Sequence, residues 1–270
     1  MSSTLDTDAV AAEARRLDLA DRERVQVKQT TLLHPDATID DAYRIQAAWR
    51  EIRVGRGERI IGHKIGLTSR AMQASMAIST PDSGFLTDAM AFEESDDIVT
   101  AAFCDLRVEV ELAFVLGRDL GGPDVDVASV LAATDHVVPA VELIAARTHR
   151  TDPETGRTRT VVDTIADNAA DAGIVTGGRP VGPGEVDLRW VGALLYRNGT
   201  LEETGLAAGV LNHPARGLVW LARRYAEHGL SLEAGQTVLS GSFTRPVPVA
   251  PGDVFHIDFG PLGAFPLRFT

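Results

Sequence analysis

Residues 107–114 read Arg107-Val108-Glu109-Val110-Glu111-Leu112-Ala113-Phe114, a segment in which polar and apolar side chains alternate. A β-strand has a side-chain period of two, so this pattern predicts a strand with one apolar face and an opposite face that carries both glutamates. The two carboxylates would be about 6.6 to 7 Å apart along the strand and point the same way. Two flexible acidic side chains in this arrangement can converge on one ion.

A third acid, Glu142, lies in residues 137–144, where every other residue is apolar. A buried carboxylate without a partner is costly. If the two segments are neighbouring strands, Glu109, Glu111 and Glu142 form an oxygen-rich site for a hard divalent cation such as Mg²⁺ or Mn²⁺. Two other interpretations remain open: the alternating acids can form a solvated sheet face, and Glu142 can pair with Arg147.

The composition is that of a soluble globular protein, with 270 residues, 44% hydrophobic and 24% charged. The 38 acidic residues outnumber the 26 Lys and Arg residues, and the formal net charge of −12 argues against nucleic acid or an anionic membrane as a partner. We expect a cytoplasmic protein, because the sequence has neither a signal-peptide pattern nor a long apolar span. The single cysteine, Cys104, is expected to be a small core or loop residue.

The chain divides into two expected parts, an N-terminal helical appendage over residues 1–58 and a metal-binding catalytic domain over residues 59–270. The appendage contains a helix over 7–24 and a second helix that Thr38 can cap. The catalytic domain is expected to begin with a strand over 60–66, a helical patch from Ser69 to Met76 and a turn at Pro81-Asp82-Ser83-Gly84.

Later segments predict a helix over 126–134, a type I′ hairpin at Asn198-Gly199, and a helix from Asn212 that ends at Gly229. Strands follow at 238–239, 254–259 and 265–269. This order predicts an α+β fold with a β-rich mixed sheet. The sequence shows no P-loop or dinucleotide-binding fingerprint.

Together, several segments resemble the hydratase branch of the fumarylacetoacetate hydrolase superfamily. They are Gly62-His63-Lys64-Ile65-Gly66-Leu67-Thr68-Ser69, Pro81-Asp82-Ser83-Gly84, Arg107-Val108-Glu109-Val110-Glu111, Pro139-Ala140-Val141-Glu142 and Asp163-Thr164-Ile165-Ala166-Asp167-Asn168-Ala169. Three more resemble the hydratases that act on 2-oxo-hepta-3-ene-1,7-dioate in homoprotocatechuate breakdown: Asp152-Pro153-Glu154-Thr155-Gly156-Arg157, Leu211-Asn212-His213-Pro214-Ala215 and Ser240-Gly241-Ser242-Phe243-Thr244-Arg245-Pro246.

The resemblance implies a β-rich mixed-sheet roll with a small N-terminal helical region. It implies a metal held by Glu109, Glu111 and Glu142, with Lys64 and Asp82 near a small 2-oxo acid substrate. It also implies a homo-oligomer built from dimers, often a decamer, and association with a related decarboxylase. The segment before Arg147 departs from the expected pattern, because alanine stands where an acid is expected.

The function implied is that of a hydro-lyase that adds water to a 2-oxo-alkenedioate in aromatic catabolism. The 2-hydroxypenta-2,4-dienoate hydratases and the 4-oxalocrotonate decarboxylases share the acidic triad and the Gly-His-Lys segment, so both stay open as alternatives. A third alternative is a non-catalytic subunit of a hydratase–decarboxylase assembly, and the complete set of acids argues against it.

Proton transfer is expected of Lys64 and Asp82, since a buried lysine can shift its pKa and a carboxylate can relay protons. In the alternative interpretation, Lys64 is a strand-edge lysine and Asp82 a turn residue. His63 lies on the opposite strand face from Lys64, and we expect it to be structural. Thr164, Asp167 and Asn168 are expected either to hydrogen-bond substrate or to cap a turn. Ser240 and Ser242 are expected to contact a substrate carboxylate.

The far carboxylate of a dioate needs local positive charge on this acidic protein. Arg157 and Arg159 are the expected ligands, with Arg245 a lesser candidate. The alternative is that these arginines are solvated or pair with nearby acids.

Overall fold

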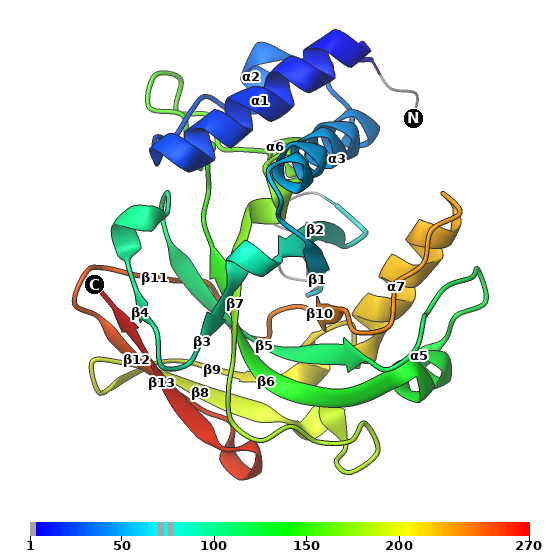
Figure 1. Ribbon diagram of the computed structural model, residues 1–270. Coiled ribbons are helices and arrows are strands. Elements are labelled where there is room, and N and C mark those ends of the chain that lie inside the picture. The colour runs from blue at the N-terminus through cyan, green and yellow to red at the C-terminus, as the bar shows by residue number, and fades with distance from the viewer. Residues whose placement is uncertain (1–3, 70–72, 75–77) are drawn as a thin grey trace.

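Figure 1 shows the computed structural model, which describes residues 4–69, 73–74 and 78–270. Three helices come first: α1 (Thr7–Glu23), α2 (Thr30–Leu33) and α3 (Ile39–Gly55). Asp6 caps α1, and Thr38 forms a capping box with Asp41 at the start of α3, as its sequence predicts. Among the described residues, none of the helices is long and apolar enough to cross a membrane.

The N-terminal helices share a small apolar core with a later element. Leu17 of α1 and Ile45 and Trp49 of α3 cluster with Ile165 of α6 (Val161–Ala166). Figure 1 shows these helices in blue on one side of the molecule, with α6 beneath them. The helical region is therefore anchored through α6, and the expected boundary at residues 58 and 59 falls in the turn between α3 and β1 (Ile60–Gly66).

Two sheets form the rest of the described structure. The order in the larger sheet is β2 (Asp82–Thr87), β1, β10 (Thr237–Leu239), β5 (Arg107–Leu116), β6 (Thr134–Ile144), β7 (Asp171–Thr176) and β3 (Ala91–Glu93), and β11 (Val247–Pro248) also pairs with β5. The β1–β10 and β3–β7 pairs are parallel, and the other pairs are antiparallel. The expected mixed sheet is therefore confirmed.

The second sheet has the order β4 (Asp97–Ile98), β13 (Ala264–Phe269), β12 (Val254–Asp258), β8 (Gly192–Arg197) and β9 (Thr200–Leu206). The β8–β9 turn has φ values of 52° at Asn198 and 81° at Gly199, as a type I′ turn requires. Two more helices are α5 (Val127–Ala133) and α7 (Ala215–Ala226). Short 3₁₀ turns complete the chain: η1 (Asp88–Met90), η2 (Thr100–Ala102), η3 (Asn168–Ala170), η4 (Leu188–Trp190), η5 (Ala207–Gly209) and η6 (Gly260–Leu262).

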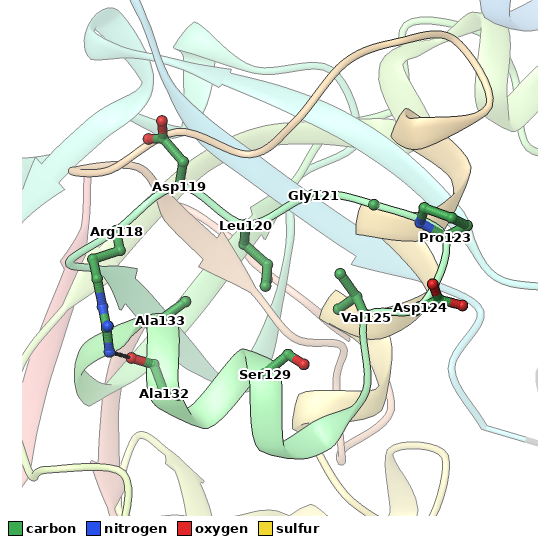
Figure 2. A pocket seen from close by; sticks show the side chains of 11 residues that line it. Arg118, Asp119, Leu120, Gly121, Pro123, Asp124, Val125, Ser129, Ala132 and Ala133 are labelled. Carbon is green, nitrogen blue, oxygen red and sulfur yellow. Dashed lines mark hydrogen bonds between the residues drawn. The ribbon is translucent and has the colours of Figure 1, made fainter.

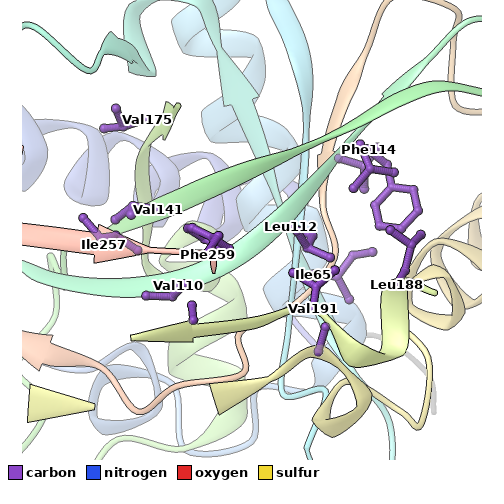
Figure 3. Packing of buried hydrophobic residues seen from close by; sticks show 14 of the residues in the cluster. Ile65, Val110, Leu112, Phe114, Val141, Val175, Leu188, Val191, Ile257 and Phe259 are labelled. Carbon is purple, nitrogen blue, oxygen red and sulfur yellow. The ribbon is translucent and has the colours of Figure 1, made fainter. Parts of the chain in front are cut away.

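The main core fills the space against the apolar face of β5. Figure 3 shows Val110, Leu112 and Phe114 of β5 in one cluster with residues such as Ile257 of β12 and Phe259. Burial of each such side chain stabilises the fold by about 1.5–3 kcal/mol. Because these residues fill one face of β5, the alternate residues, including Glu109 and Glu111, must point to the other face of the sheet.

One expected turn is a strand. Pro81 and Gly84 favour a turn, yet Asp82–Thr87 pairs with β1 along its length, with Asp82 opposite Gly66. Tertiary pairing overrides the local preference here. The helical patch expected from Ser69 to Met76 lies largely outside the described residues, although 73–74 are helical.

A buried ion pair fixes the connection after β6. The Arg147 guanidinium lies 2.5 Å, from Nε to Oδ1, from the carboxylate of Asp167, and both side chains are at most 1% exposed. The second oxygen of Asp167 accepts hydrogen bonds from the backbone N–H groups of Arg147 and Thr148. The acid that the sequence pattern places just before Arg147 is thus supplied 20 residues later. The alternative pairing of Arg147 with Glu142 is wrong.

Asp167→Ala is expected to lower the free energy of unfolding by about 3–5 kcal/mol, because it leaves the buried Arg147 without its carboxylate. Urea denaturation followed by circular dichroism measures the loss. The matched control is Asp187→Ala, which removes an exposed pair with Arg189 at 2.6 Å and should have a much smaller effect. Equal losses in the two variants would contradict the anchoring role of Asp167.

Candidate active site

Three carboxylates meet on the face of the larger sheet opposite the main core. The antiparallel register of β5 and β6 places Glu109 directly across from Glu142, and Glu111 follows two residues along β5. One oxygen from each acid can be chosen so that all three lie within 4.8 Å of one another. The convergence expected from the alternating sequence is therefore present in the structure.

Glu111 and Glu142 are buried and short of partners, whereas Glu109 is partly exposed. Glu111 is 1% exposed and Glu142 is fully buried, so the solvated sheet face is wrong as an interpretation. Glu111 Oε2 accepts a hydrogen bond of 2.8 Å from the Gly241 N–H. Within the described part of the chain, Glu111 Oε1 and both oxygens of Glu142 accept no hydrogen bond. Lys64 Nζ, 3.2 Å from Glu142 Oε1, forms an ion pair with the cluster.

The electrostatics of the cluster favour a bound cation. Burial, and then the charge of Glu142, raise the pKa of Glu109 to about 8 and that of Glu111 well above its usual range. One lysine cannot neutralise three carboxylates, so the cluster stays short of positive charge. Carboxylate oxygens that converge with free lone pairs fit a hard divalent cation.

Lys64 and Asp82 stand beside the acids on paired strands. A Cβ at Gly66 would lie 2.3 Å from Asp82 Oδ1 and 3.0 Å from Lys64 Nζ, so glycine leaves the space that both groups occupy. Asp82 Oδ1 is buried and accepts no hydrogen bond from any described residue. Burial would lower the pKa of Lys64, but the nearby charges of Glu142 and Asp82 outweigh it and hold that pKa above its usual value. Burial raises the pKa of Asp82.

A cavity of about 440 Å³ opens onto this group. Its walls include Lys64, Asp82 and Glu109, together with Thr164 and Ser242. The Thr164 hydroxyl donates to the Thr160 carbonyl, and the Ser242 hydroxyl donates within its own loop to the Thr244 carbonyl. Both residues keep their expected place at the cavity, and a direct contact with substrate stays a prediction.

Ser240 has a different place. Its hydroxyl is fully buried, and it has no hydrogen-bond partner among the residues described. The loop that contains Ser240 and Ser242 instead aims the N–H of Gly241 at Glu111. We therefore reassign Ser240 from substrate binding to the support of a candidate metal ligand.

Asn168 is also reassigned. Its Oδ1 accepts from the Phe85 N–H at 2.9 Å and its Nδ2 donates to the Phe85 carbonyl at 3.0 Å, so β2 occupies both ends of the amide. Asn168, Ala169 and Ala170 have φ values of 51°, 52° and 61°, a left-handed run that costs of the order of 1–3 kcal/mol per residue. The two hydrogen bonds of the Asn168 side-chain amide hold this turn in place. Ala169 and Ala170 line the cavity.

The candidate arginines also differ in position, because some line the cavity and one does not. Arg157 is exposed at a hairpin tip, where its carbonyl accepts from Gln29 Nε2 at 2.8 Å. The cavity wall is formed instead by Arg159, Arg150 and Arg245. The expected role in substrate binding thus fits Arg159 and not Arg157.

Sequence reasoning missed two charged residues, Arg150 and Asp171. Asp171 begins β7, is 1% exposed, and has two carboxylate oxygens that accept no hydrogen bond in the described structure. Burial, and then the charge of Glu142, raise its pKa well above the usual range. A lone acid at the head of the apolar segment 172–175 was the available signal, of the same kind that identified Glu142.

His63 has the structural role expected of it. The ring lies on the other face of β1 and is 4% exposed, with Nδ1 3.1 Å from the Tyr225 hydroxyl. Burial lowers the pKa of His63 to about 4, so the ring is neutral at physiological pH. It supports the contact between β1 and α7.

A second hollow lies away from the acids, in the connection between β5 and α5. Figure 2 shows its wall, a cavity of about 470 Å³ between residues 118–125 and α5. Arg118 donates to the Ala132 carbonyl and Asp119 accepts from the Ala234 N–H at 2.8 Å. Both charged groups therefore hold the loop in place.

The chain is similar to known hydratases over most of its length. A 2-oxo-hept-4-ene-1,7-dioate hydratase of Escherichia coli is 55% identical over 257 residues, which cover 95% of this chain and 96% of the relative. A 2-keto-4-pentenoate hydratase of Paraburkholderia xenovorans strain LB400 is 39% identical over 235 residues, 87% of this chain and 85% of the relative.

A solved structure extends the similarity to the whole fold. The 4-oxalocrotonate decarboxylase from Pseudomonas putida G7, complexed with magnesium and adipate, has a TM-score of 0.94 at 34% identity and covers 100% of both chains. The family model for the C-terminal part of fumarylacetoacetate hydrolase matches residues 54–269, which include both sheets and all the candidate site residues. The chain belongs to the fumarylacetoacetate hydrolase family.

Proposed function

We propose that this protein is a divalent-metal-dependent hydratase that adds water to a 2-oxo-alkenedioate such as 2-oxo-hepta-3-ene-1,7-dioate. The observation that supports this most strongly is the group of three convergent acids, of which Glu111 and Glu142 are buried and have oxygens that accept no hydrogen bond from the described residues, at a cavity that Lys64 and Asp82 also line. The 55% identity to a dioate hydratase over nearly the whole chain supports the substrate class.

Glu109, Glu111 and Glu142 would hold the cation. Their hard oxygen donors suit Mg²⁺, and Mn²⁺ is an acceptable substitute. When bound there, a divalent cation supplies Lewis-acid polarisation of the 2-oxo group of the substrate. The Gly241 N–H fixes one oxygen of Glu111, which leaves the other free for the ion.

Lys64 and Asp82 would carry the proton transfers. Hydration of a conjugated 2-oxo-3-enoate adds the water oxygen to C4 and a proton to C3. Lys64 Nζ holds a proton beside Glu142, and the unpaired Asp82 Oδ1 is free to accept one. Both side chains are buried at the cavity wall, so protons would pass between substrate and these two groups.

The decarboxylase alternative has a specific observation in its favour, the whole-chain likeness to 4-oxalocrotonate decarboxylase. Decarboxylation breaks a C–C bond and releases CO₂, whereas hydration consumes water and releases nothing. The five-carbon alternative, 2-hydroxypenta-2,4-dienoate hydration, uses the same acids on a substrate with one carboxylate. A homo-oligomer and a decarboxylase partner stay predictions, which light scattering of the purified protein and co-purification check.

Assay of the purified protein with Mg²⁺ and the seven-carbon dienedioate tests the proposed reaction. We expect loss of the dienoate absorbance without release of CO₂, because water and not carboxylate is exchanged. The same assay with 4-oxalocrotonate is the comparison. Stoichiometric CO₂ from either compound would favour the decarboxylase.

Glu111→Gln is expected to abolish the stabilisation by Mg²⁺ and reduce activity by about 10²-fold or more, because it removes one anionic ligand and keeps an acceptor for Gly241. The readout is the melting temperature with and without Mg²⁺, since a ligand that binds only the folded state raises it. In the absence of metal the variant should melt no lower than the parent protein, because a buried repulsion is removed.

The matched control for this variant is Glu154→Gln, which changes an exposed glutamate paired with Lys28. It should keep both the Mg²⁺ response and the activity. A full rise in melting temperature with Mg²⁺ in Glu111→Gln, or wild-type activity after exhaustive chelation, would contradict the assignment of the metal site.

Lys64→Met and Asp82→Asn are expected to lower turnover by about 10²- to 10⁴-fold through loss of proton transfer. Metal affinity should not fall in Lys64→Met, because the substitution removes a cation 3.2 Å from a candidate ligand. Titration calorimetry with Mg²⁺ and single-turnover kinetics separate the two effects. Parallel losses of metal affinity and turnover would contradict this division of labour.

A further inference from the structure

Arg150 and Arg159 are direct neighbours across a short antiparallel bridge. Thr151 pairs with Thr158, and the Arg159 N–H donates to the Arg150 carbonyl at 2.9 Å. In this register the two arginines oppose each other, with their side chains on the same side. Like charges in directly opposed positions are destabilising. The pair is therefore a local excess of positive charge, which Asp105 beside Arg150 offsets in part.

The backbone imposes this arrangement from outside the pair. Asp152 Oδ1 accepts from the N–H groups of Glu154 and Thr155, which closes the hairpin tip. Gln29 Nε2 then donates to the carbonyls of His149 and Arg157, one on each side of the hairpin. The hairpin is thus fixed by contacts that do not involve the guanidinium groups, and the two charges are held together against their repulsion.

Both arginines line the cavity, and each guanidinium group has one buried nitrogen without a hydrogen-bond partner among the described residues. Arg150 donates through Nε to Asp105, but its Nη2 is buried and has no partner in the described part of the chain. Arg159 Nη1 is likewise buried and, among the same residues, unpaired. Burial, and then the charge of Arg150, lower the pKa of Arg159 to about 10, so the side chain is still cationic at neutral pH.

A carboxylate meets all of these conditions. It supplies negative charge between two like charges, and its two oxygens match planar guanidinium donors. The cavity that Arg150 and Arg159 line also reaches Lys64, Asp82 and Glu109, so one ligand can span both regions. Arg245 is less suited to the role, because its side chain is 82% exposed.

We propose that Arg150 and Arg159 bind the distal carboxylate of the substrate and so determine specificity for dioates over single-carboxylate 2-oxo acids. The inference rests on the proposed function, in which the acids and their cation take the 2-oxo acid end. It assigns the selectivity to Arg150 and Arg159, at the base of the hairpin. The hairpin tip, where Arg157 lies, only closes the loop.

Binding of two unreactive probes tests the subsite without turnover. Adipate and hexanoate both have six carbons, and only adipate has a second carboxylate. In calorimetry with Mg²⁺ present, the parent protein should bind adipate more tightly than hexanoate. Arg159→Gln should weaken adipate binding by about tenfold or more and leave hexanoate unchanged, since only adipate uses the contact. Arg157→Gln, two residues away and exposed, is the matched control and should change neither.

Kinetics supply the second arm. In Arg159→Gln, kcat/KM should fall about ten- to a hundredfold for the seven-carbon dioate and stay unchanged for 2-hydroxypenta-2,4-dienoate. Equal losses on the two substrates, or on adipate and hexanoate, overturn the proposal, because the arginines would then serve the shared 2-oxo end or the fold. If the parent protein hydrates neither compound, the proposed function fails while the probe binding still decides the subsite.

Stability separates a binding role from a structural one. Without ligand, Arg159→Gln should melt at or above the temperature of the parent protein, because one of two opposed like charges is removed. A lower melting temperature assigns Arg159 to the fold and overturns the proposal. Arg159→Lys keeps the charge and loses the planar fork, so it should show a partial loss confined to adipate and the dioate.

Discussion

The constraint on which this structure depends is the convergence of three carboxylates, two of them buried, on one face of one sheet. Two carboxylates that are both ionised, with oxygens within 4.8 Å of each other, repel by about 3.5 kcal/mol or more at an effective dielectric constant of about 20. Three acids make three such contacts, and Lys64 offsets only part of them. The apolar face of β5, packed into the main core, leaves Glu109 and Glu111 no other direction to point. The core thus holds the carboxylates in an arrangement that they would not adopt alone.

The neighbouring elements maintain this arrangement with uncharged groups. The Gly241 N–H orients Glu111, the missing side chain of Gly66 makes room for Lys64 and Asp82, and the amide of Asn168 ties a left-handed turn to β2. None of these groups adds positive charge. The cluster of acids therefore stays short of positive charge in the folded protein, as preorganisation for a cation requires.

Much of the fold and part of the site could be predicted from the sequence, and the limits are physical. The alternation around Glu109 decides the strand and its two faces, because a period of two is a local property. The contact between Lys64 and Glu142 depends on sheet order, with β10 inserted between β1 and β5, and no local pattern encodes that order. Asp82 was expected in a turn because the pairing that extends it comes from a neighbouring strand.

The substrate-binding residues were harder to predict, for the same reason. An amide, a hydroxyl or a guanidinium can serve the backbone or a ligand, and only its partners distinguish the two roles. Asn168 and Ser240 were assigned to substrate from their motifs, whereas their surroundings occupy or enclose them. The sequence pattern predicted no role for Arg150, because that role depends on its position opposite Arg159. The position in turn depends on the hairpin register.

Two regions of unbalanced charge, opposite in sign, therefore face one cavity. The acids have Lys64 as their ion-pair partner, the arginine pair has Asp105 beside Arg150, and separate elements hold the two regions on the walls of the same cavity. A dianion alone would be repelled at the acidic end, so under the proposed function the cation must bind before the 2-oxo acid end can. The arginine pair attracts an anion with or without the cation. Affinity for the metal and for the dioate must then be coupled, and by linkage each ligand raises the affinity for the other by the same factor.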